Sequence, residues 1–269
     1  GDSSSVQDQL KGVRQIQSTY HAFAAVLAHG SVVTWGDAAH GGHSSAVQDQ
    51  LRSVQQIQST ACAFAAILVD GSVVTWGHVE RGGDSSEVRD QLKGVGQIQA
   101  THGAFAAILE DGSVVTWGKA EIGGDSSAVQ EQLRNVQQIQ ATPSAFAAIL
   151  EDGSVVAWGR AGSGGNSSAV QEQLRGVQQI QATRSAFAAI LEDGSVVTWG
   201  CADTGGDSSA VQCQLRSVQQ VQATRGAFAA ILEDGSVVTW GDAAKGGDSF
   251  LVRDQLRAGR GFEEVGRSK

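Results

Sequence analysis

Histidine and cysteine are two residue types in this chain that could bind a metal ion. The three cysteines, Cys62, Cys201 and Cys213, form neither a CxxC pair nor a mixed His/Cys ligand pattern. The six histidines share no common spacing, with no carboxylate or cysteine at ligand spacing; they are His21, His29, His40, His43, His78 and His102. We therefore expect surface histidines, no metal site and no cofactor. Free thiols in a reducing compartment are the expected state of the cysteines, with one incidental disulfide as the alternative.

Serine is the other candidate nucleophile, and a pair of serines recurs in an Asp-Ser-Ser-like segment of each unit. Side chains of this kind cap turns, because their oxygens accept hydrogen bonds from nearby backbone amides. The sequence contains neither GxSxG nor a glycine-rich phosphate-binding loop with lysine. We therefore predict no catalytic residues and a protein that is not an enzyme.

Charge and hydropathy exclude further classes. The net charge of −9 argues against non-specific binding to nucleic acid or to an anionic membrane. No apolar run approaches the roughly 20 residues of a membrane helix, and no signal peptide is recognisable. The chain starts with Gly1, already inside its repeat pattern, so we expect it to be a piece of a longer protein. The expected location is intracellular, in the cytoplasm or the nucleus.

A 41-residue repeat organises the whole chain. A Gly-Asp-Ser-Ser-like segment begins at Gly1 and returns at every forty-first residue up to Gly247. A Trp-Gly pair closes each unit with the same step, from Trp35 to Trp240. Six complete units span 1–246, and 247–269 is expected to be a partial seventh repeat followed by a disordered tail.

Each unit predicts three antiparallel strands and one short capped helical turn. In the unit 124–164, Val129 and Leu133 follow the Asp-Ser-Ser cap four residues apart, on one face of a helical turn. Residues 136–142 have a low apolar content, which fits a strand with one wet face whose glutamines line a central channel. Residues 145–150 are apolar on both faces, and Asp-Gly then predicts a hairpin into the strand 154–158.

The double-sided apolar strand must be covered by neighbouring units, because a lone hairpin is marginal in water. Radially arranged blades cover both faces, so the predicted fold is an all-β propeller of six three- to four-stranded blades. The alternative is a seven-bladed propeller of which only six blades are complete in this sequence. A linear solenoid would need specialised caps, and the first unit is regular, which favours a closed ring over an open stack. The six tryptophans are expected to pack between blades, with a sugar-stacking ring as the alternative.

Two short segments vary from unit to unit while the strands hardly change. One is the pair before Ala-Phe-Ala-Ala, and the other is the four residues after Trp-Gly. Strand direction places both on one rim, opposite the hairpins with their Glu-Asp-Gly turns. We predict that this rim binds a partner, whereas drift of solvated loops after recent duplication is the neutral alternative. The candidate binding residues are Tyr20, His21, Arg81, Lys119, Arg160, Arg184, Arg225 and Lys245.

The stretch Ala-Phe-Ala-Ala-Ile-Leu-Glu-Asp-Gly-Ser-Val-Val-Thr-Trp-Gly, residues 186–200, resembles the repeat of the regulator-of-chromosome-condensation family. The likeness recurs in all six units, and it implies a propeller, usually of seven blades. In that family such propellers accompany ubiquitin-ligase, exchange-factor and scaffold roles.

The leading hypothesis is a non-enzymatic scaffold that binds an unidentified protein partner through the rim, without nucleic acid or membrane. The alternatives are a guanine-nucleotide exchange factor for a small GTPase and a sugar- or ligand-binding propeller.

Overall fold

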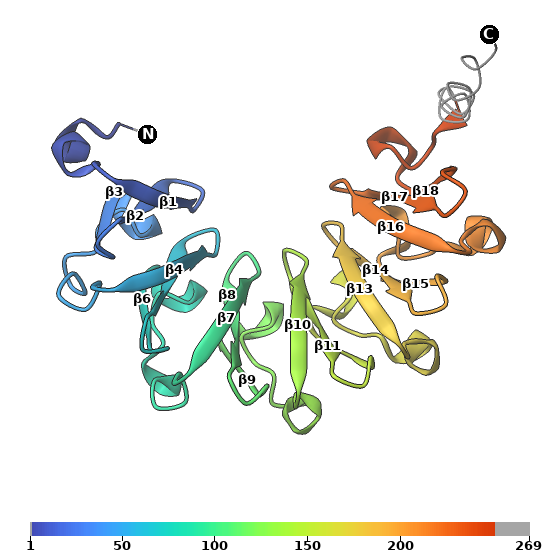
Figure 1. Cartoon of the computed structure of the whole chain (residues 1–269), viewed down its shortest axis with the longest axis horizontal. Coiled ribbons are helices and arrows are strands. Elements are labelled where there is room, and N and C mark those ends of the chain that lie inside the picture. The colour runs from blue at the N-terminus through green and yellow to red at the C-terminus, as the bar shows by residue number, and fades with distance from the viewer. Residues whose placement is uncertain (1, 251–269) are drawn as a thin grey trace, which may run out of the picture.

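The computed structural model describes residues 2–250 and shows six similar three-stranded sheets, one for each repeat (Figure 1). All pairings are antiparallel, in the order first, second, third strand. The first strands are β1 (Val13–Ser18), β4 (Val54–Ser59), β7 (Val95–Ala100), β10 (Val136–Ala141), β13 (Val177–Ala182) and β16 (Val218–Ala223). The second strands are β2 (Ala22–Leu27), β5 (Ala63–Leu68), β8 (Ala104–Leu109), β11 (Ala145–Leu150), β14 (Ala186–Leu191) and β17 (Ala227–Leu232). The third strands are β3 (Val32–Gly36), β6 (Val73–Gly77), β9 (Val114–Gly118), β12 (Val155–Gly159), β15 (Val196–Gly200) and β18 (Val237–Gly241).

Short 3₁₀ helices connect the strands. One kind opens a unit: η1 (Ser4–Gln9), η4 (Ser86–Val88), η6 (Gln130–Gln132), η8 (Ser168–Gln173) and η10 (Ser209–Gln214). The other kind follows the third strand: η2 (Ala38–His40), η3 (Val79–Arg81), η5 (Ala120–Ile122), η7 (Ala161–Ser163), η9 (Ala202–Thr204) and η11 (Ala243–Lys245). The expected capped turn is therefore present, but its detail differs from the prediction. Asp125 accepts a hydrogen bond from the Ser127 amide at 2.9 Å, one turn before η6, and does not cap the helix itself.

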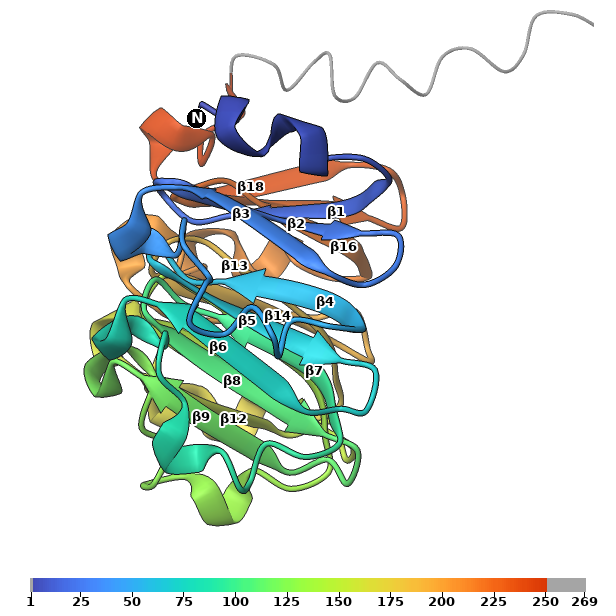
Figure 2. The same ribbon diagram turned by 90° about the vertical axis from the view of Figure 1, so that its left-hand side faces the viewer.

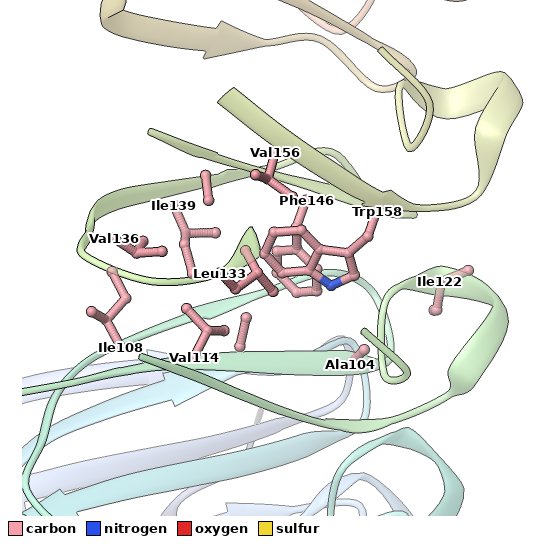
Figure 3. Close-up of a cluster of buried hydrophobic side chains, with 12 residues drawn as sticks. Ala104, Ile108, Val114, Ile122, Leu133, Val136, Ile139, Phe146, Val156 and Trp158 are labelled. Atoms are coloured by element: carbon pink, nitrogen blue, oxygen red, sulfur yellow. The ribbon is translucent and has the colours of Figure 1, made fainter. Parts of the chain in front are cut away.

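The blades pack side by side as a propeller, and the junction between the third and fourth blades shows how (Figure 3). The face of the third blade offers small and branched side chains, among them Ala104, Ala106 and Ile108. Leu133, Ile139 and Phe146 of the fourth blade pack onto that face and are 0–1% exposed. The same positions form the other described junctions. In the second to fifth blades, the strand that is apolar on both faces is thus covered by one neighbouring blade on each side, as predicted.

Polar contacts repeat at every junction as well. The Trp158 indole Nε1 donates to the carbonyl oxygen of Gly123, in the preceding unit, at 3.1 Å, and the amide of Val136 donates to the oxygen of Gly112. Gly123 has a φ of +103°, and a Cβ there would lie 2.5 Å from the Phe146 ring, so only glycine fits. The tryptophans are therefore buried packing residues, which removes the basis for a sugar-stacking ring.

The blades form an open arc, and the first blade does not pack on the sixth (Figure 1). The inner strands follow one another from β1 beside β4 to β13 beside β16. Seen from the side, the arc is a single layer of blades with the first and last at the same end (Figure 2). The propeller prediction is confirmed, whereas the expected closed ring is wrong for these six blades. The predicted partial seventh repeat and disordered tail span residues 247–269. Of these, residues 251–269 lie outside the described structure.

Candidate protein-interaction site

Each unit carries two loops on the rim opposite its hairpin, which we call the loop rim. In the fifth unit, the first loop is residues 183–185, between β13 and β14, and the second is residues 201–204, after β15. The amide of Cys201 donates to the oxygen of Ser185 at 2.8 Å, and the Thr183 hydroxyl donates to the oxygen of Thr204 at 3.0 Å. Since both bonds use constant backbone or threonine groups, the variable side chains sit on a rigid frame.

The first loops of successive blades are also joined to one another around the inside of the arc. The amide of Tyr20 donates to the oxygen of Ala61, that of Ala61 to His102, and that of His102 to Pro143, at 2.9–3.1 Å. Arg184 donates in the same way to Arg225 at 3.0 Å. Proline has no N–H, so Pro143 cannot make the corresponding bond to the next unit. This row of loops brings side chains from distant units together.

A cavity of about 680 Å³ lies against this row of loops. Three arginines from three consecutive units line it, Arg160, Arg184 and Arg225, together with Tyr20 and His102. No carboxylate is among its lining residues, which are otherwise Ala141, Pro143, Ser144, Ser163, Ala182, Thr183, Ser185 and Thr224. We call it the arginine cavity. It is a concentration of positive charge on a chain whose net charge is −9.

The pKa of His102 is sensitive to the positive charge beside the arginine cavity. Burial lowers the pKa of His102, and the nearby positive charges of Arg81 and Arg225 lower it further. The imidazole is therefore neutral at pH 7, and the Tyr20 hydroxyl lies 3.1 Å from its Nε2. A carboxylate close to His102 would instead raise the pKa of the imidazole. The part of this shift that comes from Arg81 and Arg225 indicates a positive potential at His102 on the loop rim, which favours an anion.

The sequence-predicted rim residues divide into two groups. Tyr20, Arg160, Arg184 and Arg225 line the arginine cavity, and Arg81 acts on His102 beside it. The other three lie on second loops or outside the cavity lining: Lys119 pairs with Glu121 at 3.4 Å, Lys245 pairs with Asp242 at 2.7 Å, and the His21 ring contacts His40.

His102 and Pro143 were not among the predicted binding residues. Both occupy the repeat position of Tyr20, Arg184 and Arg225, so the alignment of units alone could have placed them in the same row. The pKa of Asp242 is lowered mainly by its hydrogen bond with Lys245 and, to a smaller extent, by the positive charge of Arg184. Its carboxylate is already paired with Lys245.

Comparison with known proteins identifies the fold. No family model matches the chain, and no curated protein matches its sequence. Among solved structures, the chain is similar to yeast RCC1 (Prp20) bound to Kap60, with a TM-score of 0.50 and 15% identity over 88% of this chain and 72% of that one. A second structure of Prp20p, from Saccharomyces cerevisiae, gives a TM-score of 0.51 with 15% identity, over 88% and 74% of the two chains.

The fold is that of an RCC1-type β-propeller. The CRINKLY WD40 ectodomain of the Arabidopsis thaliana receptor kinase ACR4 is also similar, with a TM-score of 0.49 and 16% identity over 82% of this chain and 80% of that one. Within residues 2–250 of this RCC1-type propeller, no helix has the length and apolar character needed to cross a membrane.

Proposed function

We propose that this RCC1-type propeller is a non-enzymatic interaction module that binds an acidic segment of a protein partner in the arginine cavity. The observation that carries the proposal is the convergence of Arg160, Arg184 and Arg225 on one cavity without a lining carboxylate. Guanidinium groups bind carboxylates through paired N–H donors, and a cavity concentrates their field. The proposed ligand is thus a run of aspartate or glutamate side chains.

Solved relatives of the fold agree with a protein partner. The yeast RCC1 structure is a complex with Kap60, and the second Prp20p structure is described with its binding to Gsp1p and histones. A location inside the cell, in the cytoplasm or the nucleus, is part of the proposal. The three cysteines are free thiols, which agrees with a reducing compartment.

The test is a binding titration with a fluorescently labelled glutamate-rich peptide, followed by fluorescence polarisation. The double variant Arg184→Glu/Arg225→Glu is expected to weaken binding at least about tenfold, because two attractive charges become repulsive. Raising the salt concentration should weaken binding to the unaltered protein, because salt screens exposed charges. The melting temperature should stay unchanged, since both arginines are on exposed loops.

Lys119→Glu is the matched control, because Lys119 is on the same rim but outside the cavity lining. A glutamine-rich peptide of equal length is the ligand control. Equal binding of the two peptides, or an equal loss in the Lys119→Glu variant, would refute the arginine cavity as the binding site.

A further inference from the structure

The outer edge of the third blade carries a groove that is separate from the arginine cavity. Its strand β9 lies on the outer margin of the arc (Figure 1), and within residues 2–250 no strand pairs with the outer edge of β9. The groove has a volume of about 640 Å³, within the range of roughly 300–1,000 Å³ that is usual for ligand sites. Residues 114–118 of β9 line it, together with parts of the unit-opening segments 84–91 and 124–130.

The backbone of β9 offers hydrogen-bonding groups to this groove. The amide of Lys119 donates to the oxygen of Gly103 at 2.8 Å, and antiparallel neighbours alternate between pairs that exchange hydrogen bonds and pairs that do not. The N–H and C=O groups of Val114 and Thr116 therefore point away from β8. The Val114 oxygen accepts a bond from Gln130 Nε2 at 2.9 Å, which agrees with this direction. An outward strand edge of this kind is a template for one more strand.

The charged side chains that line the groove are all acidic, and we call it the acidic groove. They are Glu80, Asp84, Glu87 and Asp125. Glu80 and Glu87 are exposed, and neither forms an ion pair within residues 2–250. In the same part of the chain, no three acidic, histidine or cysteine side chains are grouped closely enough to hold one metal ion. The carboxylates therefore match several separate positive charges, as on a segment rich in lysine or arginine.

Two side chains distinguish the acidic groove from its counterparts in other units. Glu87 stands where four other complete units have alanine and the first has serine. Val79, which is 64% exposed, stands where the other five units have alanine. The corresponding groove over β6 has a volume of only about 260 Å³, and its charged lining residues are Asp84 and Arg89. The acidic groove therefore depends on residues particular to this part of the chain, and not on the repeat alone.

We propose that the acidic groove binds an extended segment of a protein partner that is rich in lysine or arginine, and that this segment adds a fourth strand to the third blade. Its main chain pairs with the N–H and C=O of Thr116, its cationic side chains meet Glu80 and Glu87, and an apolar side chain packs on Val79. Strand addition takes affinity from main-chain bonds and specificity from alternate side chains. The acidic groove shares no lining residue with the arginine cavity, so either site can fail without the other.

Fluorescence polarisation with a labelled peptide of alternating lysine and valine tests the charge requirement. The unaltered chain should bind one peptide. The double variant Glu80→Lys/Glu87→Lys should bind it at least about tenfold more weakly, because two attractive charges become repulsive. The melting temperature should stay the same, since both side chains are exposed. Val79→Ala, which restores the residue of the other units, should weaken binding by a smaller factor.

Glu131→Lys/Glu172→Lys is the matched control, because it changes the net charge equally. Both residues are exposed on unit-opening segments and lie outside the lining of the acidic groove. This control variant should bind the peptide nearly as well as the unaltered chain. An equal loss in the two double variants would overturn the proposal, because binding would then follow the net charge of the chain and not the groove.

A peptide of the same sequence with alternate amides N-methylated separates strand pairing from charge attraction. It should bind several-fold more weakly, because the methyl groups remove main-chain donors. Binding of the unmethylated peptide should also slow hydrogen exchange at the Thr116 amide, followed by NMR. Equal binding of the two peptides or unchanged exchange at Thr116 would overturn the proposal. So would a failure of the unaltered chain to bind the unmethylated peptide at low ionic strength.

Discussion

The first and fourth blades have nearly the same strands but very different surroundings. Phe23 and Phe146 each stack on the tryptophan opposite them, with ring centroids 5.2 and 5.1 Å apart. Phe146 is fully buried, because the third blade covers it, whereas Phe23 remains partly exposed at the tip. The contact inside a blade is thus the same in both, and the preceding blade makes the difference. The full burial of this ring therefore depends on the neighbouring blade, as is typical of repeat proteins.

Replacing the two phenylalanines would measure that difference. Phe146→Ala should cost about 3–5 kcal/mol of unfolding free energy, because it leaves a cavity in a closed junction. Phe23→Ala should cost clearly less, because the Phe23 ring is already partly exposed. Denaturant titration of both variants checks the comparison. Equal losses would show that packing inside a blade, not between blades, holds these rings.

Ser217 offers a smaller test at the place where one hairpin meets the next blade. Its φ is +51°, and the equivalent position in units one, three and five is glycine. Ser217→Gly should stabilise the protein by about 1 kcal/mol, because a side chain in the left-handed region costs about 1–2 kcal/mol. Ser236→Gly is the matched control, since Ser236 has no positive φ. It should destabilise by about 0.5–1 kcal/mol, because glycine loses more chain entropy on folding.

Acid sensitivity of the hairpin turns should give the smallest effect. In Asp111, Asp152 and Asp193, hydrogen bonds from the serine two residues later lower the pKa of the carboxyl group. Because the folded pKa is lowered, this stabilisation is complete above the usual aspartate pKa of about 3.9 and is lost as the pH falls below it. Melting temperatures measured from pH 6 downward should show the loss. Asp152→Asn should flatten the curve slightly, and an unchanged curve would contradict the assignment.

Much of the fold could be predicted from the sequence because its determinants are local and repeated. The pairing of Phe146 with Trp158 and the hairpin at Gly153 follow from alternation and turn chemistry within one unit. The open arc could not be predicted in this way. Curvature depends on the small rotation at each junction, which is set by how side chains such as Ala106 and Leu133 interlock, and not by the period of the pattern.

The site was predictable only in part for a related reason. Strand direction placed Arg184 and Arg225 on one rim, and both line the arginine cavity. The contribution of Tyr20, which comes from the first unit and meets His102 of the third, depends on how far the arc bends. Lys119 and Lys245 have the same charge but acidic partners two or three residues away, Glu121 and Asp242. The arginines of the cavity have no acidic residue within four positions, so this spacing could have separated the two groups from the sequence.

The identical junctions also bear on how such a chain can change its length. The row of constant contacts passes from each unit to the next at the same positions, for example from Gly112 to Val136 and from Gly153 to Val177. Loss or duplication of the codons for any 41 consecutive residues therefore joins two blade surfaces that already match. Unequal recombination can shorten or lengthen the array one blade at a time without a new packing solution, while each retained loop keeps its own side chains.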